Sequence, residues 1–291
     1  MDMLQSNRNV DSETLILDIF KVAKNKPRKN DIFYEENFYD YVVLSLMWPQ
    51  TNCYFYHSKD KDNKFDVNLL KQLIEKNCSV CDMPSNIYKW TIHGLWPSYD
   101  ALPEREKKGK IYFCHSEHKT YTTESISHLS EDLRINWISY SSHLDSNHLQ
   151  RHEWKKHGTC TKRIKMDRPH SFFQETINLY HHYDPSNLLE DLLEEKRISD
   201  GQSFQIEDIR NVLKEKLATP RFICMKTMES NGQQNQYLLE IRICLDKIDL
   251  KPIDCSNIDR NACDDTKPVI YVANKAPCPG KKYIRPKVHG K

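Results

Sequence analysis

Apolar residues recur with two different periods along this chain, and the period predicts where strands and helices lie. Residues 41–48 are almost all apolar and end at Pro49, which predicts a central strand buried on both faces. Other strand-like runs lie at 90–97, 221–224, 237–244 and 269–272. Helical spacing predicts helices at 66–77, 123–139, 171–180, 185–193 and 206–217. Helices in the middle and strands towards both ends favour one α+β domain, with a mainly antiparallel central sheet flanked by helices.

The first 36 residues do not share this pattern. A short amphipathic stretch at 15–22 runs into the basic segment 24–30. The basic segment could contact RNA, but a solvated linker is the favoured interpretation. We therefore interpret residues 1–36 as an N-terminal extension and residues 37–291 as one folded domain.

Charge and hydropathy exclude some classes of protein. No apolar run approaches the roughly 18 residues that a spanning helix needs, so the chain is not expected to enter a membrane. The formal net charge is only +2. An anionic ligand would therefore have to be held by local charges rather than by the field of the whole protein.

The ten cysteines indicate a disulfide-stabilised protein in an oxidising compartment. Only Cys78 and Cys81 have the short spacing of a zinc pair. We expect a secreted or lysosomal protein, although residues 15–20 are too short and too polar for a signal-peptide core, so a signal would have to be missing from this sequence. Asn77 begins a weak N-glycosylation triplet.

One stretch, residues 152–160, gathers side chains that can do chemistry. If it is helical, His152, Glu153, Lys156 and His157 share one half of the helix, whereas Trp154 and Lys155 point the other way. A glycine then predicts a left-handed helix end, and a cysteine could anchor it. The His-Glu-x-x-His zinc motif needs histidines four apart, but these are five apart, so a metal site is disfavoured. Alone, such a segment is most often a solvated helix.

A second stretch, residues 91–97, combines a strand pattern with a histidine. Alternation places Ile92 on the face of Trp90 and His93 on the other face, where the strand meets a loop. Trp96 follows as an aromatic residue of that loop. Alone, a histidine and a tryptophan here are more often packing residues.

Together the two stretches resemble the two active-site segments of the ribonuclease T2 family, in the family's order: Thr91-Ile92-His93-Gly94-Leu95-Trp96-Pro97 and His152-Glu153-Trp154-Lys155-Lys156-His157-Gly158-Thr159-Cys160. The resemblance covers roughly residues 38–280. It implies that 37–291 is a catalytic domain and that the chain is a metal-independent endoribonuclease, monomeric and without a cofactor. It would cut single-stranded RNA to 2′,3′-cyclic phosphate ends.

The reaction needs a base, an acid and positive charge at the phosphate, and the resemblance implies which residues supply them. His157 would be the general base and His93 the general acid. His152 and Lys156 would contact the phosphate, and Glu153 would polarise or position the transition state. An RNA-binding or signalling protein of the same fold is the alternative, but mere binding does not require all five groups.

Base recognition departs from the family pattern. Trp96 resembles the residue that stacks on a base, with a buried loop tryptophan as the alternative. Ser98 stands where an acidic residue is frequent, Leu46 where a glutamine is frequent and Leu149 where an aromatic residue is frequent. We expect Trp96, Leu46 and Leu149 at the base-binding positions, and an altered or relaxed base preference.

The resemblance also implies disulfides. It suggests Cys114–Cys160, Cys224–Cys278 and Cys244–Cys255, with Cys53 paired to Cys78 or Cys81. The remaining one of that pair and Cys263 could form an extra bridge.

Overall fold

A computed structural model describes residues 39–58, 66–81, 83, 88–99, 111–114, 121–140, 147–161, 166–229, 232–256 and 261–279. The extension expected at residues 1–36 lies outside these ranges. All ten cysteines and every residue proposed for the site lie inside them.

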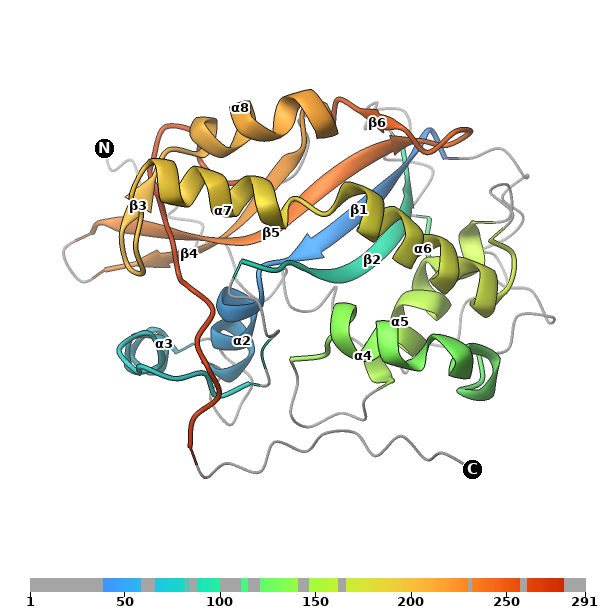
Figure 1. Cartoon of the computed structure of the whole chain (residues 1–291), viewed down its shortest axis with the longest axis horizontal. Coiled ribbons are helices and arrows are strands. Elements are labelled where there is room, and N and C mark those ends of the chain that lie inside the picture. The colour runs from blue at the N-terminus through green and yellow to red at the C-terminus, as the bar shows by residue number, and fades with distance from the viewer. Residues whose placement is uncertain are drawn as a thin grey trace, which may run out of the picture.

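In the described residues a seven-stranded sheet runs through the centre of the molecule (Figure 1). Its strands are β1 (Tyr41–Met47), β2 (Thr91–Ser98), β3 (Ser203–Phe204), β4 (Arg221–Met228), β5 (Gln234–Asp246), β6 (Pro252–Ile253) and β7 (Val269–Ile270). The order is β2-β1-β5-β7-β3, and β4 and β6 also pair with β5. All pairings are antiparallel except that of β5 with β7. The expected α+β fold is confirmed.

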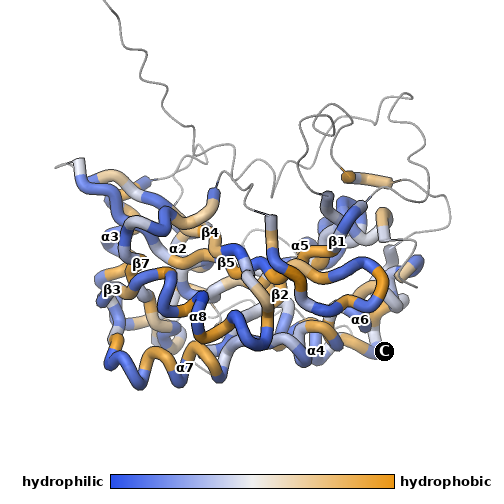
Figure 2. The backbone as a smooth tube through the Cα atoms, turned by 90° about the horizontal axis from the view of Figure 1, so that it is seen from above, coloured by the Kyte–Doolittle hydropathy of each residue, from blue (hydrophilic) through white to orange (hydrophobic). Residues whose placement is uncertain are grey.

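Helices pack around this sheet in groups (Figure 1). They are α2 (Pro49–His57), α3 (Val67–Ile74), α4 (Ser130–Asn136), α5 (His148–Lys156), α6 (Pro169–Tyr183), α7 (Ser186–Glu195) and α8 (Ile206–Leu217), with 3-10 turns η2 (Glu124–Leu129) and η3 (Gly158–Cys160). Figure 2 shows apolar and polar residues alternating along α7 and α8. In α8 the buried residues are Ile206, Ile209, Leu213 and Leu217, the spacing that places one face on the core.

The helix expected at 123–139 is shorter and begins as a 3-10 turn. It ends before Trp137, whose backbone leaves the helical region. The Trp137 indole N–H donates to the carbonyl of His93 at 2.9 Å, and its ring packs on Phe173 of α6. Contact with β2 and α6 thus fixes this residue outside the helix.

The five disulfides confirm three expected pairings and correct two. Cys114–Cys160, Cys244–Cys255 and Cys53–Cys81 form as the resemblance allowed. The expected Cys224–Cys278 bridge and the extra bridge expected between Cys78 and Cys263 were both wrong, because Cys224 pairs with Cys263 and Cys78 pairs with Cys278.

Backbone pairing explains the exchange of partners. Cys263 N–H bonds to Phe222 O and Cys224 N–H bonds to Asn261 O, so the segment around Cys263 runs beside β4. Cys278 N–H instead bonds to Ser79 O, which brings Cys278 to Cys78.

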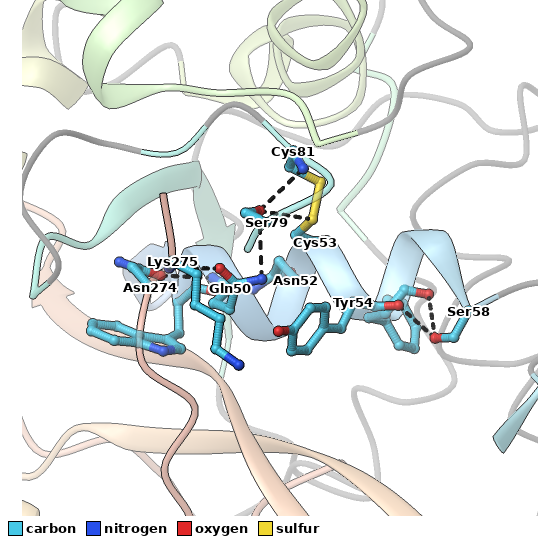
Figure 3. Close-up of a disulfide and its surroundings, with 11 residues drawn as sticks. Gln50, Asn52, Cys53, Tyr54, Ser58, Ser79, Cys81, Asn274 and Lys275 are labelled. Carbon is cyan, nitrogen blue, oxygen red and sulfur yellow. Dashed lines mark hydrogen bonds between the residues drawn. A yellow bond between two sulfur atoms is a disulfide. The ribbon is translucent and has the colours of Figure 1, made fainter. Parts of the chain in front are cut away.

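The Cys53–Cys81 bridge lies in the same junction (Figure 3). Ser79 accepts a hydrogen bond from the Cys81 N–H, and Gln50 exchanges bonds with Asn274 and Lys275. The chain near its C-terminal end is therefore attached to the beginning of α2.

Candidate active site

A β-bulge in β2 aims His93 at the site. Ser45 of β1 pairs with Gly94 and Leu46 pairs with Ile92, so His93 is an extra residue between two pairs. In a regular strand two residues three apart point to opposite faces. The bulge changes this, and the rings of His93 and Trp96 meet edge to face at 4.9 Å. Ile92 points the other way, into the main core.

Helix α5 brings the second set of residues to the same place. Glu153, Lys156 and His157 are all buried, and the helix ends at His157. On the opposite side Trp154 is fully buried against Phe172 of α6. The division of this helix into a polar face and a packing face is as expected from the sequence.

The centre of the arrangement is the carboxyl group of Glu153, which is 1% exposed. Its Oε1 lies 3.9 Å from Nε2 of His93, and its Oε2 lies 4.0 Å from Nε2 of His157. The Trp96 indole N–H donates to Oε2 at 2.7 Å. Two imidazoles, one from the sheet and one from a helix end, thus face one anchored carboxyl group.

Two glycines permit this close packing. A Cβ on Gly94 would lie 2.2 Å from Glu153 Oε2 and 2.5 Å from the Trp96 indole nitrogen. A Cβ on Gly158 would lie 2.3 Å from the Trp154 ring. The left-handed helix end expected at Gly158 is not formed, since Gly158 starts η3 without a positive φ. Close approach, rather than backbone conformation, is what requires glycine there.

Burial controls the protonation of the helix residues. It lowers the pKa of His157 well below the usual value, and the charge of Lys156 adds to the effect. Burial and Lys156 likewise lower the pKa of His152 to about 3. Burial raises the pKa of Glu153, against the opposing effects of His93 and Lys156. His157 is therefore a neutral imidazole at neutral pH, able to accept a proton.

His157 has few polar contacts around its ring. Its Nδ1 is buried and has no hydrogen-bond partner among the residues described. The rings of Tyr112 and Trp96 each lie 5.3 Å from it, and the Lys156 ammonium lies 4.8 Å from the centre of the Tyr112 ring. The imidazole is thus fixed by packing rather than by hydrogen bonds.

The expected base-binding residues are only partly brought together. Trp96 is half-buried, and the Arg242 guanidinium lies 5.0 Å from the centre of its ring. Leu46 and Leu149 do not reach the site, because both side chains are packed in the main core. An aliphatic side chain gains free energy by leaving water, so a leucine at either position turns inward. Ser98 Oγ donates to the Trp96 carbonyl of its own strand.

Sequence reasoning missed Glu240, Arg242, Tyr56 and Tyr112. Glu240 Oε1 is 2.8 Å from Nδ1 of His93. Burial raises the pKa of Tyr56, and the charges of Glu240 and Glu153 raise it further. One signal was available: Glu240 and Arg242 are charged residues two apart in an otherwise apolar strand, and such residues share one face of a sheet.

The described residues contain one group with the composition of a metal site, Cys53, His57 and Cys81. Its two sulfur atoms are bonded to each other, and metal binding by cysteine requires the thiolate. Within the described ranges, no helix is both long and apolar enough to cross a membrane.

Comparison with known proteins identifies the family of the chain. The model of the Ribonuclease T2 family matches residues 39–255. Ribonuclease T2 of Sus scrofa is 32% identical over 201 residues, which are 68% of this chain and 88% of that protein. Extracellular ribonuclease LE of Solanum lycopersicum is 28% identical over 174 residues, 59% of this chain and 69% of that protein.

The crystal structure of human RNase T2 has a similar fold. It superposes with a TM-score of 0.56 at 23% identity, covering 81% of this chain and all of that one. The chain belongs to the ribonuclease T2 family. It is an endoribonuclease of the T2 type.

Proposed function

We propose that the chain cleaves single-stranded RNA without a metal ion, with His157 as general base and His93 as general acid. His157 takes the proton of a ribose 2′-hydroxyl, and the 2′-oxygen attacks the adjacent phosphorus. As that bond forms, the bond from phosphorus to the 5′-oxygen breaks. His93 gives the departing 5′-oxygen a proton, and a 2′,3′-cyclic phosphate remains.

One observation carries this assignment. The Nε2 atoms of His93 and His157 face the same carboxyl group at 3.9 and 4.0 Å, from two different elements. The two rings differ in surroundings: burial keeps His157 neutral, whereas His93 has the carboxylate of Glu240 on its other nitrogen. A neutral imidazole accepts a proton, and an imidazolium beside a carboxylate is stabilised as a donor.

Positive charge and hydrogen-bond donors for the phosphate come from the other residues of α5. Lys156 supplies a cation in a buried position, and His152 lies near enough for Lys156 and His93 to lower its pKa. Because burial raises the pKa of Glu153, its carboxyl group in the neutral form can donate a hydrogen bond to a phosphorane oxygen. These donors would bind the extra charge of the transition state.

The test is digestion of a single-stranded RNA oligonucleotide in EDTA, with the new ends identified by mass spectrometry. We expect 2′,3′-cyclic phosphate ends and a bell-shaped pH profile. His93→Ala and His157→Ala should each abolish turnover with folding intact, whereas His128→Ala, which removes an exposed imidazole stacked on His170, should not. Inhibition by EDTA, or turnover in either site variant, would contradict the assignment.

We further propose that the protein acts as a monomer in a secreted or lysosomal location. Five disulfides and the similarity to a relative named as extracellular support an oxidising compartment. Expression of the full coding sequence in a eukaryotic host should deliver active, monomeric enzyme to the medium or to lysosomes. Accumulation of active protein in the cytosol would contradict this.

A further inference from the structure

The carboxylate behind His93 has four donors around it. Glu240 is 2% exposed. Its Oε1 faces Nδ1 of His93 at 2.8 Å. Its Oε2 accepts from Nε and an Nη of Arg242, at 3.0 and 2.8 Å, and from the Ser45 hydroxyl at 3.2 Å. The carboxylate is thus enclosed by protein groups. Its ion pair with Arg242 uses only Oε2, and Oε1 is left for His93.

We propose that Glu240, held by Arg242 and Ser45, is the positioning residue of His93, fixing the Nδ1–H tautomer and stabilising the imidazolium that protonates the leaving group. This inference rests on the proposed role of His93 as general acid. Glu240 touches neither substrate nor reacting atoms in this scheme, and it acts through the imidazole.

The charge of Glu240 decides the tautomer. Burial alone would raise its pKa, but Arg242 and His93 outweigh burial and lower it to about 2. At working pH the group is an ionised carboxylate, which can only accept hydrogen bonds. Nδ1 of His93 must therefore carry the proton, and Nε2 becomes the nitrogen that gains and loses the catalytic proton on the side of Glu153.

The sheet places these groups by register rather than by chance. Ser45 of β1 pairs with Gly94 of β2 on one side and with Arg242 of β5 on the other. The bulge in β2 turns His93 onto this face, next to the small side chain of Ser45. His93 of β2, Ser45 of β1 and the Glu240–Arg242 ion pair of β5 thus lie in one row across three adjacent strands.

A ring of contacts that begins at Arg242 and returns to His93 links this row of residues to helix α5. Arg242 lies over Trp96, Trp96 donates to Glu153, and Glu153 faces the other nitrogen of His93. Each nitrogen of His93 is therefore oriented by a different carboxyl group. Glu240 holds Nδ1 at hydrogen-bond distance, whereas Glu153 lies farther from Nε2.

A merely structural ion pair is the competing explanation, since removal of one partner of a buried pair destabilises a protein by several kcal/mol. Glu240→Gln separates the two ideas. Arg242 and Ser45 still require an acceptor, so the amide oxygen should stay with them and the amide NH₂ should face Nδ1. That arrangement makes Nδ1 an acceptor and disfavours the imidazolium.

We expect Glu240→Gln to lower kcat by roughly 10²-fold or more, as orienting partners of functional histidines do, with KM nearly unchanged. The alkaline limb of the pH profile should move towards lower pH. Glu240→Asp, which keeps the charge on a shorter side chain, should recover part of kcat. Glu207→Gln is the matched control, because it makes the same change in an exposed Glu–Arg pair of α8.

A substrate with an activated leaving group gives the decisive measurement. A nucleoside 3′-(4-nitrophenyl phosphate) releases a phenolate that needs no proton from an acid. On this substrate both His93→Ala and Glu240→Gln should approach the wild-type rate, whereas His157→Ala should remain inactive. All four nucleosides should be tried, because base preference is open.

The outcomes distinguish a failure of the acid role of His93 from a failure of the positioning role of Glu240. If His93→Ala is not rescued by the activated substrate, the proposed acid role fails. If His93→Ala is rescued and Glu240→Gln is not, or if Glu240→Gln leaves the pH profile unmoved, the positioning role is overturned while the acid role stands. Circular dichroism and thermal unfolding identify a variant that has simply lost its fold, and Glu240→Asp then supplies the test.

Discussion

Replacing Trp96 in two ways distinguishes a catalytic support from a base-stacking surface. Trp96→Phe removes the indole N–H that donates to Glu153 at 2.7 Å but keeps an aromatic face. Trp96→Ala removes both. If Trp96 only stacks on a base, Trp96→Phe should be nearly silent. If it also anchors Glu153, Trp96→Phe should impair the chemical step.

The expected size follows from the hydrogen bond that is lost. A hydrogen bond to an uncharged carboxyl group contributes about 0.5–1.5 kcal/mol, which corresponds to roughly 2- to 13-fold in rate if it is fully expressed in the transition state. Glu153 lies about 4 Å from both imidazoles, so movement of its carboxyl group alters both ends of the reaction. We therefore expect kcat to fall in this range for Trp96→Phe, with KM little changed.

Trp96→Ala should show the same loss of kcat together with weaker binding. Stacking of one base on an aromatic ring contributes about 1–3 kcal/mol, so KM should rise by roughly 5- to 150-fold. Steady-state kinetics on a short single-stranded RNA give both constants. Trp154→Phe is the matched control: it changes a tryptophan on the core side of α5, the helix that carries Glu153, and it should reduce stability without changing kcat.

Two results would refute this reasoning. An unchanged kcat in Trp96→Phe would mean that the indole N–H does not matter to Glu153 during the reaction. An unchanged KM in Trp96→Ala would mean that the ring, already in contact with Arg242 and His157, binds no base.

Two further predictions concern stability and covalent structure. The folded-state pKa of His152, about 3, lies below its usual value near 6.5. Between these two pH values the unfolded chain binds a proton at His152 and the native protein does not. The free energy of unfolding should therefore fall as the pH drops from about 6.5 towards 3, by up to about 1.4 kcal/mol per pH unit. Urea unfolding between pH 6.5 and 5, above the range in which the carboxyl groups titrate most, should show a flatter slope in His152→Asn; equal slopes would contradict the shift. Peptide mapping without reduction should recover Cys78–Cys278 and Cys224–Cys263 as linked pairs, and a Cys224–Cys278 peptide would refute the observed connectivity.

The features predicted well from sequence are local ones. The apolar run at 41–48 gives β1, and the helical spacing at 206–217 gives α8. The shared face of Glu153, Lys156 and His157 follows from helix geometry alone. In each case the period of the pattern and the period of the structure are the same, so no knowledge of distant residues is needed.

Features that depend on pairing between distant segments escaped prediction. Alternation along residues 90–97 cannot reveal the bulge at His93, because the bulge exists only relative to the register of β1. Cys224 has two possible partners whose choice depends on which segment runs beside β4. Glu240 became part of the site for the same reason, since its neighbours Ser45 and His93 come from strands about 150 to 200 residues away in sequence.

The contacts around His93 are separate from the positions at which this chain departs from the family's base-recognition pattern. The contacts that orient His93 run through Glu240, Arg242, Trp96 and Glu153, and none of them involves position 46, 98 or 149. Leu46 and Leu149 pack in the core instead, so the polar or aromatic side chains expected from the family pattern are absent at these two positions. Catalytic rate and base preference should therefore vary independently in this protein, since only Trp96 belongs to both.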